Sequence, residues 1–176
     1  MSKPKPLFSN EIDCLVRRIL SVRDRVQWLG VFARDQLPDL NRLARPYALV
    51  FNSDPQDKPG QHWLAIYGPE TGPIELFDSY GLSPGYYSLD PHHILHNKSS
   101  FQSSFSVVCG HYCIVFLYYR SVGVSFHEFI ELLDSQANHQ LDSLIADTLT
   151  NLKHTFNLLY PCTRTGQCSK TKCSFC

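Results

Sequence analysis

The sequence predicts an α+β domain in which a small, mostly antiparallel sheet packs against a buried central helix. Three short apolar runs, at 47–51, 62–67 and 74–78, are separated by turn residues, and this pattern indicates a meander of strands. A longer, almost entirely apolar run at 109–120 has the length of a helix and is typical of one buried in a core. Strands grouped before helices favour the α+β class.

Other segments show the periodicity of surface helices. Ser9 or Asn10 can cap a helix that runs to about Val22, because apolar residues recur there every three or four positions. Ser125 can cap another helix in the same way. The remaining segments are a loose arm at 1–8, an apolar run at 27–32, a region of loop with a little helix at 85–106, and helices at 126–133 and 142–159.

Charge and hydropathy exclude several classes of protein. The 176 residues, 43% of them hydrophobic, suffice for one domain with a full core. Basic and acidic residues balance at 16 each, so the overall charge does not indicate binding to nucleic acid or to an anionic membrane. No run reaches the roughly 18 apolar residues of a membrane span. The N-terminal residues lack the apolar block of a signal peptide, so we expect neither a membrane protein nor signal-directed secretion.

Cysteines gather at the end of the chain. We expect a folded domain over 1–161 followed by a basic, cysteine-rich tail over 162–176. Four of the seven cysteines lie in this tail: Cys162, Cys168, Cys173 and Cys176. Four interpretations of the tail remain open, namely an inert segment, a disulfide-forming segment, a zinc site, and a segment that activates the domain in cis.

A histidine and an aspartate occupy neighbouring strands of the meander. His62 begins the second strand and Asp78 ends the third, with one turn between them. Adjacent antiparallel strands can bring such positions side by side. A carboxylate that accepts a hydrogen bond from one imidazole nitrogen fixes the tautomer and leaves the other nitrogen free to act as a base. Asp78 has an alternative role as the cap of the turn that follows it.

A cysteine stands where a loop enters the apolar helix. Cys109 precedes Gly110 at the predicted N-terminus of that helix, where the helix dipole and free N–H groups favour the thiolate. The same N–H groups can hold an oxyanion, and the Gln102 side chain can supply a second donor. Together with His62 and Asp78, these residues form a candidate thiol hydrolase site.

Five segments of the chain, in this order, resemble the adenovirus endopeptidase (adenain) family. Its wider clan includes the SUMO-specific proteases and enzymes of large DNA viruses and self-synthesising transposons. The segments are WLGVFARDQLPDL (28–40), YALVFNS (47–53), GQHWLAIY (60–67), LFDSYGLS (76–83) and CGHYCIVFLYY (109–119). Gln102 has the family's spacing to the cysteine. Adenain has Glu where this chain has Asp78, whereas the SUMO-protease side of the clan has Asp.

The resemblance implies a viral or transposon-encoded cysteine endopeptidase. Cys109, His62 and Asp78 would be the catalytic residues, Gln102 the oxyanion donor, and Trp63 a shield for the site. Its substrates would be viral or capsid precursor polypeptides, cleaved after Gly during particle maturation. The resemblance also implies a location in the host nucleus and the virion.

Cofactors and partners follow from the same comparison. The sequence requires no cofactor and no metal, and we expect a monomer. Adenain uses DNA and a peptide as activators, so an activating peptide, or DNA bound by the basic tail, is the candidate partner here.

Two other functions remain open. The Asp78 triad also suits an isopeptidase that removes ubiquitin or a ubiquitin-like protein. The third reading is a catalytically silent interaction module. Among single residues, Cys113 is interpreted as core rather than a resolving thiol. The cluster of His92, His93 and His96 is interpreted as a solvated loop rather than a metal site.

Overall fold

A five-stranded sheet forms one layer of the structure. The computed structural model describes residues 4–21, 25–136 and 138–159. The strands lie side by side in chain order. They are β1 (Gln27–Ala33), β2 (Tyr47–Asn52), β3 (Trp63–Gly68), β4 (Ile74–Phe77) and β5 (Ile94–His96). The three predicted strands are the central ones, and they pair antiparallel as the meander predicts.

The two edge strands correct the prediction. β1 pairs parallel with β2, and β5 pairs parallel with β4, so the sheet is mixed rather than mostly antiparallel. Parallel neighbours need long connections, and both are present here. Short 3₁₀ turns occupy these connections, at Arg34–Gln36 and Leu40–Arg42 before β2 and at Pro84–Tyr87 and Pro91–His93 before β5. The α+β class itself is confirmed.

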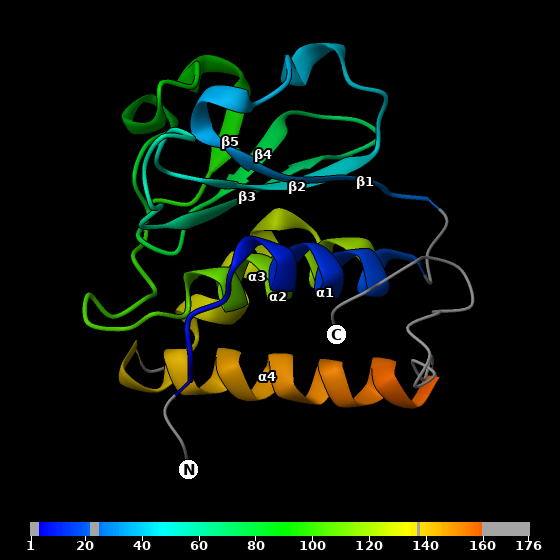
Figure 1. Cartoon of the computed structure of the whole chain (residues 1–176), viewed down its shortest axis with the longest axis vertical. Coiled ribbons are helices and arrows are strands. Elements are labelled where there is room, and N and C mark those ends of the chain that lie inside the picture. Colours follow the sequence, from blue (N-terminus) through cyan, green and yellow to red (C-terminus); the bar gives the residue numbers. More distant parts are fainter. Residues whose placement is uncertain (1–3, 22–24, 137, 160–176) are drawn as a thin grey trace.

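Four helices form the other layers (Figure 1). They are α1 (Ser9–Ser21), α2 (Cys109–Ser121), α3 (Phe126–Asp134) and α4 (Asn138–Leu159). α2 lies between the sheet and α4, and its residues from Cys109 to Leu117 are all buried. This confirms the predicted central helix. Among the described helices, none combines the length and apolarity needed to cross a bilayer.

Phe77 at the end of β4 is the centre of the core between sheet and helices. Its ring packs on Phe116 of α2 and Phe129 of α3, with centroids 5.1 and 5.4 Å away. Tyr112 and Phe101 pack around the same ring at 6.3 Å. These aromatic contacts fix the end of β4 against the helices, immediately before Asp78.

Within the described residues 4–8, the expected loose arm contacts the domain. Leu7 is buried, and its carbonyl oxygen accepts a hydrogen bond from Trp63 Nε1 at 3.0 Å. A Cβ added to Gly110 would lie 3.3 Å from Leu7 Cβ, so the arm touches the residue after Cys109. The prolines prevent a helix in this segment, but they do not prevent it from docking.

A buried ion pair joins α2 to the sheet at the far end from Cys109. Arg120 donates to Glu75 of β4 through Nε at 2.7 Å and through Nη2 at 2.9 Å. The two side chains are only 10% and 6% exposed, and the guanidinium also lies over the Tyr67 ring. Burial raises the pKa of Glu75, and the interaction with Arg120 opposes that shift. The ionised form of the carboxylate is therefore stabilised by Arg120.

Replacing one partner of this pair should destabilise the fold. We expect Arg120→Ala to lower the free energy of unfolding by about 3 kcal/mol, because Glu75 would remain buried without its cation. Urea denaturation followed by circular dichroism measures the change. Arg42→Ala is the matched control, since its ion pair with Asp39 is exposed and should contribute less than about 1 kcal/mol. Equal effects of the two substitutions would contradict the assignment.

Candidate active site

The acid at the end of β4 is held by four donors. Asp78 Oδ1 lies 2.7 Å from His62 Nε2 and accepts from the Tyr80 amide at 2.8 Å. Oδ2 accepts from the Leu82 amide at 3.0 Å and from the Tyr87 hydroxyl at 2.7 Å. Asp78 therefore caps its turn and contacts the imidazole at once, so the two predicted roles coexist. Burial raises the pKa of Asp78, but these hydrogen bonds and His62 outweigh it and the net pKa is lowered.

The turn after Asp78 depends on a glycine and an asparagine. Gly81 has φ +70°, and an added Cβ would lie 2.5 Å from the carbonyl oxygen of Ser99. Asn97 accepts from the Asp78 amide at 3.0 Å and donates to its carbonyl at 2.6 Å. The backbone of the acid is thus fixed from both sides by the segment that follows β5.

His62, the predicted base, lies just before β3 and has one ring nitrogen without a hydrogen bond in the described residues. His62 is 7% exposed, and Nε2 faces Asp78. Nδ1 is buried and forms no hydrogen bond within the described residues. The Tyr80 ring stacks on the imidazole at 4.5 Å between centroids. Since Nε2 is taken by the acid, Nδ1 is the nitrogen left to exchange a proton with the nucleophile.

Cys109, the predicted nucleophile, begins α2, and His62 affects its pKa. Burial raises the pKa of Cys109, but His62 and the backbone N–H groups of Trp63 and Gly110 outweigh it, so the net pKa is lowered. Burial alone would lower the pKa of His62, yet Asp78 and Cys109 raise it to about 9. Opposite shifts of this kind are those of a thiolate–imidazolium pair.

Gln102 is oriented by the residue after the acid. Its Oε1 accepts from the Ser79 hydroxyl at 2.7 Å, and its Nε2 donates to the Ser106 carbonyl at 3.0 Å. The Ser106 carbonyl can only accept, so it fixes which end of the amide is nitrogen, and the Ser79 hydroxyl then donates to the oxygen. Nε2 has a second N–H, for which the described residues show no acceptor. Such an N–H is suited to an oxyanion.

Sequence reasoning predicted four polar groups for the site, but it did not predict the residues that hold them. It assigned the shielding of the site to Trp63, but the ring contact that the structure gives to His62 comes from Tyr80. The antiparallel register pairs Ala65 with Phe77, and its continuation places residue 62 opposite residue 80. Tyr80 could therefore have been found from strand register. No local signal marks Tyr87, whose buried hydroxyl reaches Asp78 from a 3₁₀ turn.

Other sequence candidates lie outside this centre. His92 and His93 are exposed in a 3₁₀ turn, His96 belongs to β5, and no cluster of His, Cys, Asp or Glu able to hold a metal occurs in the described part of the chain. Cys113 is fully buried one turn after Cys109, as expected of a core residue. The tail cysteines at 162–176 lie outside the described residues.

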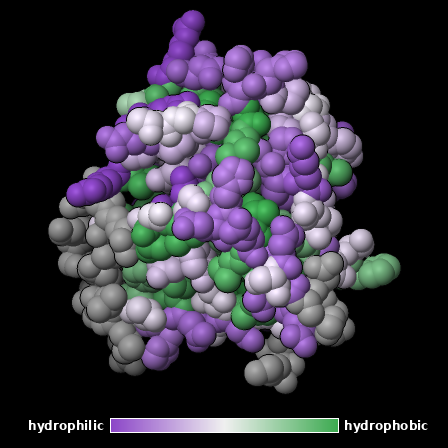
Figure 2. Space-filling view, turned by 180° about the vertical axis from the view of Figure 1, so that it is seen from behind, coloured by the Kyte–Doolittle hydropathy of each residue, from purple (hydrophilic) through white to green (hydrophobic). Residues whose placement is uncertain are grey.

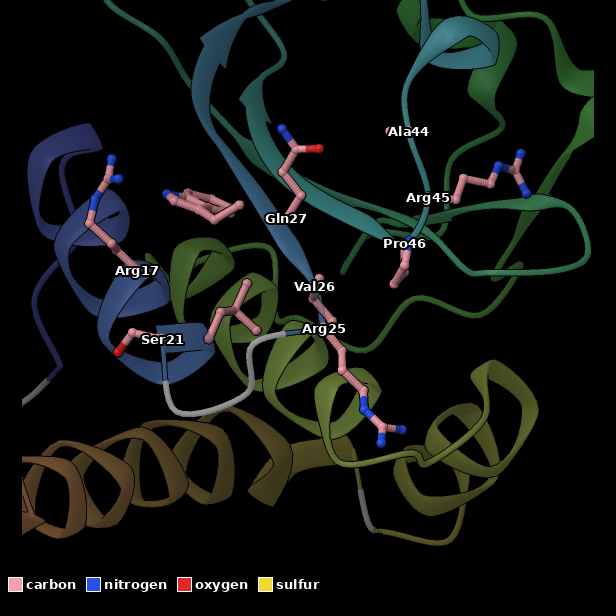
Figure 3. Close-up of a pocket in the computed structure, with 10 residues that line it drawn as sticks. Arg17, Ser21, Arg25, Val26, Gln27, Ala44, Arg45 and Pro46 are labelled. Carbon is pink, nitrogen blue, oxygen red and sulfur yellow. The ribbon is translucent and has the colours of Figure 1, made fainter. Parts of the chain in front are cut away.

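A separate pocket of about 360 Å³ lies where β1 and β2 begin, at the opposite end of these strands from His62 (Figure 3). Three arginines line it. Figure 3 shows the guanidinium groups of Arg17, Arg25 and Arg45 pointing in different directions. Arg17 pairs with Asp13, and Arg45 donates to the Gly72 carbonyl. The pocket therefore does not assemble an anion site from these three side chains.

Comparison with known proteins supports the fold. No family model and no curated protein matches the sequence. Among solved structures, the pS273R protease of ASFV matches 86% of this chain and 71% of its own, with a TM-score of 0.61 and 18% identity. The central domain of the uncharacterized Lpg1148 protein of Legionella pneumophila matches 88% and 99%, with a TM-score of 0.44 and 13% identity. The chain therefore shares the fold of a viral protease.

The lowered pKa of Cys109 leads to a prediction for its reactivity with an alkylating reagent. We expect iodoacetamide to alkylate Cys109 with a midpoint below pH 8.5, the usual pKa of a thiol, and His62→Ala to move that midpoint upward. Peptide mass spectrometry across pH measures both. Cys113 is the internal control, because burial raises its pKa and it should stay unmodified in the folded protein. A wild-type midpoint at the ordinary thiol value would contradict the pair.

The hydrogen bond from Tyr87 to Asp78 leads to a second prediction, for the variant Tyr87→Phe. Tyr87→Phe removes one of four hydrogen bonds to the Asp78 carboxylate, so the orientation of His62 should loosen. We expect the alkylation rate of Cys109 at pH 7 to fall about tenfold, the order of one charge-assisted hydrogen bond. Tyr86→Phe is the matched control, because that neighbouring ring is 69% exposed. Equal rates in the two variants would remove Tyr87 from the site.

Proposed function

We propose that this chain is a cysteine endopeptidase. The observation that carries the proposal is the hydrogen bond between Asp78 and His62, together with a cysteine that lies at the N-terminus of a helix and whose pKa is lowered by His62. The fold shared with a solved viral protease supports it. A thiol with a lowered pKa, a base with a raised one and an ionised acid are the groups that acyl transfer needs.

The geometry supports the following order of steps. The Cys109 thiolate attacks the carbonyl carbon of the scissile peptide bond. The Gln102 amide and the N–H groups at the start of α2 stabilise the oxyanion. Protonated His62 gives its Nδ1 proton to the leaving amine, and Asp78 holds the ring in place. Water then enters, loses a proton to His62 and releases the acyl group from sulfur.

The thiol is nearly enclosed, which supports a small residue next to the cut. Cys109 is 9% exposed and His62 is 7% exposed. So little exposed surface at both side chains favours a small residue, such as Gly, beside the scissile bond. We therefore retain cleavage after Gly, with viral or transposon structural precursors as substrates during particle maturation. Location in the host nucleus and virion, and activation by DNA or a peptide, belong to the same proposal.

A cleavage assay tests the proposal. Purified protein is incubated with a fluorogenic Gly-Gly peptide and with ubiquitin-like conjugates, with and without DNA. We expect thiol-dependent cleavage that falls at least about a thousandfold in Cys109→Ala and about a hundredfold in Gln102→Ala. Cys113→Ala is the matched control, because it removes a neighbouring thiol that the steps above do not use.

Two other results of this assay would favour a different function. Cleavage of the conjugates alone would identify an isopeptidase. An absence of thiol-dependent cleavage with every substrate, with and without DNA, would favour the silent interaction module and overturn the proposal.

A further inference from the structure

The loop between Gln102 and Cys109 exposes an aromatic side chain. Phe105 is 99% exposed, and Val107 is 44% exposed. A fully exposed Phe keeps a large apolar surface in contact with water, which is unfavourable unless that surface is covered by a partner. Figure 1 shows this loop, in green, projecting from the body of the domain. In Figure 2, where the molecule is turned around, a pale-green hydrophobic side chain projects at the right-hand edge of the surface.

Hydrogen bonds hold the loop in this position. Ser106 N donates to Ser103 O at 3.0 Å and closes a tight turn with Phe105 near its tip. Gln102 Nε2 donates to Ser106 O at 3.0 Å, and Ser103 N donates to Asp142 of α4 at 3.3 Å. The turn is thus held by Gln102 and by α4, and the Phe105 ring points outward into solvent.

Most of the exposed large apolar side chains belong to segments that contact the candidate active site. Within the described residues, the exposed large apolar side chains are Phe8, Leu82, Tyr86, Phe105, Val107, Leu132 and Leu144. All but the last two belong to segments that contact the site: the arm that touches Gly110, the residues after Asp78, and the loop before Cys109. Leu132 and Leu144 lie on α3 and α4.

The distance from Phe105 to the nucleophile is limited by the chain. Four peptide units separate residues 105 and 109, so their Cα atoms are at most about 14 Å apart. An extended polypeptide rises about 3.3 Å per residue. A substrate whose scissile carbonyl lies at Cys109 and which runs toward the turn therefore reaches Phe105 within about four residues.

We propose that Phe105, with Val107, is a docking contact for a bulky apolar side chain of the polypeptide substrate, within about four residues of the scissile bond. The inference rests on the proposed function. The substrate is the occupant because the turn is pinned to Gln102, beside the bond to be cut. A permanent partner would need roughly 800 Å² on each side, whereas this aromatic is flanked by Ser103, Ser104 and Ser106.

Two measurements test the docking contact. In the first, peptides with a Gly-Gly core carry Leu or Ser at each of four positions on both sides, and kcat/KM is measured for the protein and for Phe105→Ser. We expect a preference for Leu of about tenfold at one position, and its loss in the variant. In the second, binding of the same peptides to Cys109→Ala is measured by fluorescence anisotropy, with and without Phe105→Ser.

The controls separate this proposal from the proposed function. Leu144→Ser removes an exposed apolar side chain on α4 and should retain the preference. An unchanged thermal unfolding midpoint of Phe105→Ser shows that the fold is intact. If no peptide is cleaved but the Leu preference in binding depends on Phe105, the contact stands and the protease activity does not. If Phe105→Ser leaves the preference unchanged, or no peptide shows one, the contact is overturned.

Discussion

The Asp78 carboxylate is the constraint on which the rest of the site depends. It lies at the point where a buried strand ends and accepts hydrogen bonds from an imidazole, a phenol and two backbone amides. Each of its oxygens has two donors, so it has no freedom to rotate away. Its position is fixed in turn by Phe77, whose ring packs against α2 and α3. The same strand anchors the other end of α2 through Glu75 and Arg120, so β4 sets both the acid and the helix that carries the nucleophile.

Much of the fold follows from the pattern of apolar residues alone. The elements that this pattern did not predict were missed for physical reasons. The central strands and α2 are continuous apolar runs, because they are buried on both sides. β1 was seen only as an apolar run. Its register shifts between Trp28 and Gly30, and most of its residues are half-buried, so its pattern has no clean period. β5 has only three residues, too few for any period to show.

The candidate site also has parts that the sequence predicts and parts that it does not. Its reactive side chains could be predicted because their sequence signals are local: His62 precedes β3, Asp78 follows β4, and Cys109 begins α2. Their supports were missed because they come from elsewhere in the chain. Tyr87 reaches the acid from a 3₁₀ turn, and Ser79 orients Gln102, which lies 23 residues later. Only the packed structure brings these hydroxyls into contact with the groups they hold.

The contact of Leu7 with Trp63 bears on when the protein acquires its site during synthesis. That bond joins residues 56 apart, and the arm also touches Gly110, which a ribosome adds far later. The acid, the base and the arm therefore leave the ribosome before the thiol does. A nascent chain holds an incomplete site until α2 has emerged and packed beneath the sheet. The order of the parts along the sequence thus delays reactivity until the domain has a core to contain it.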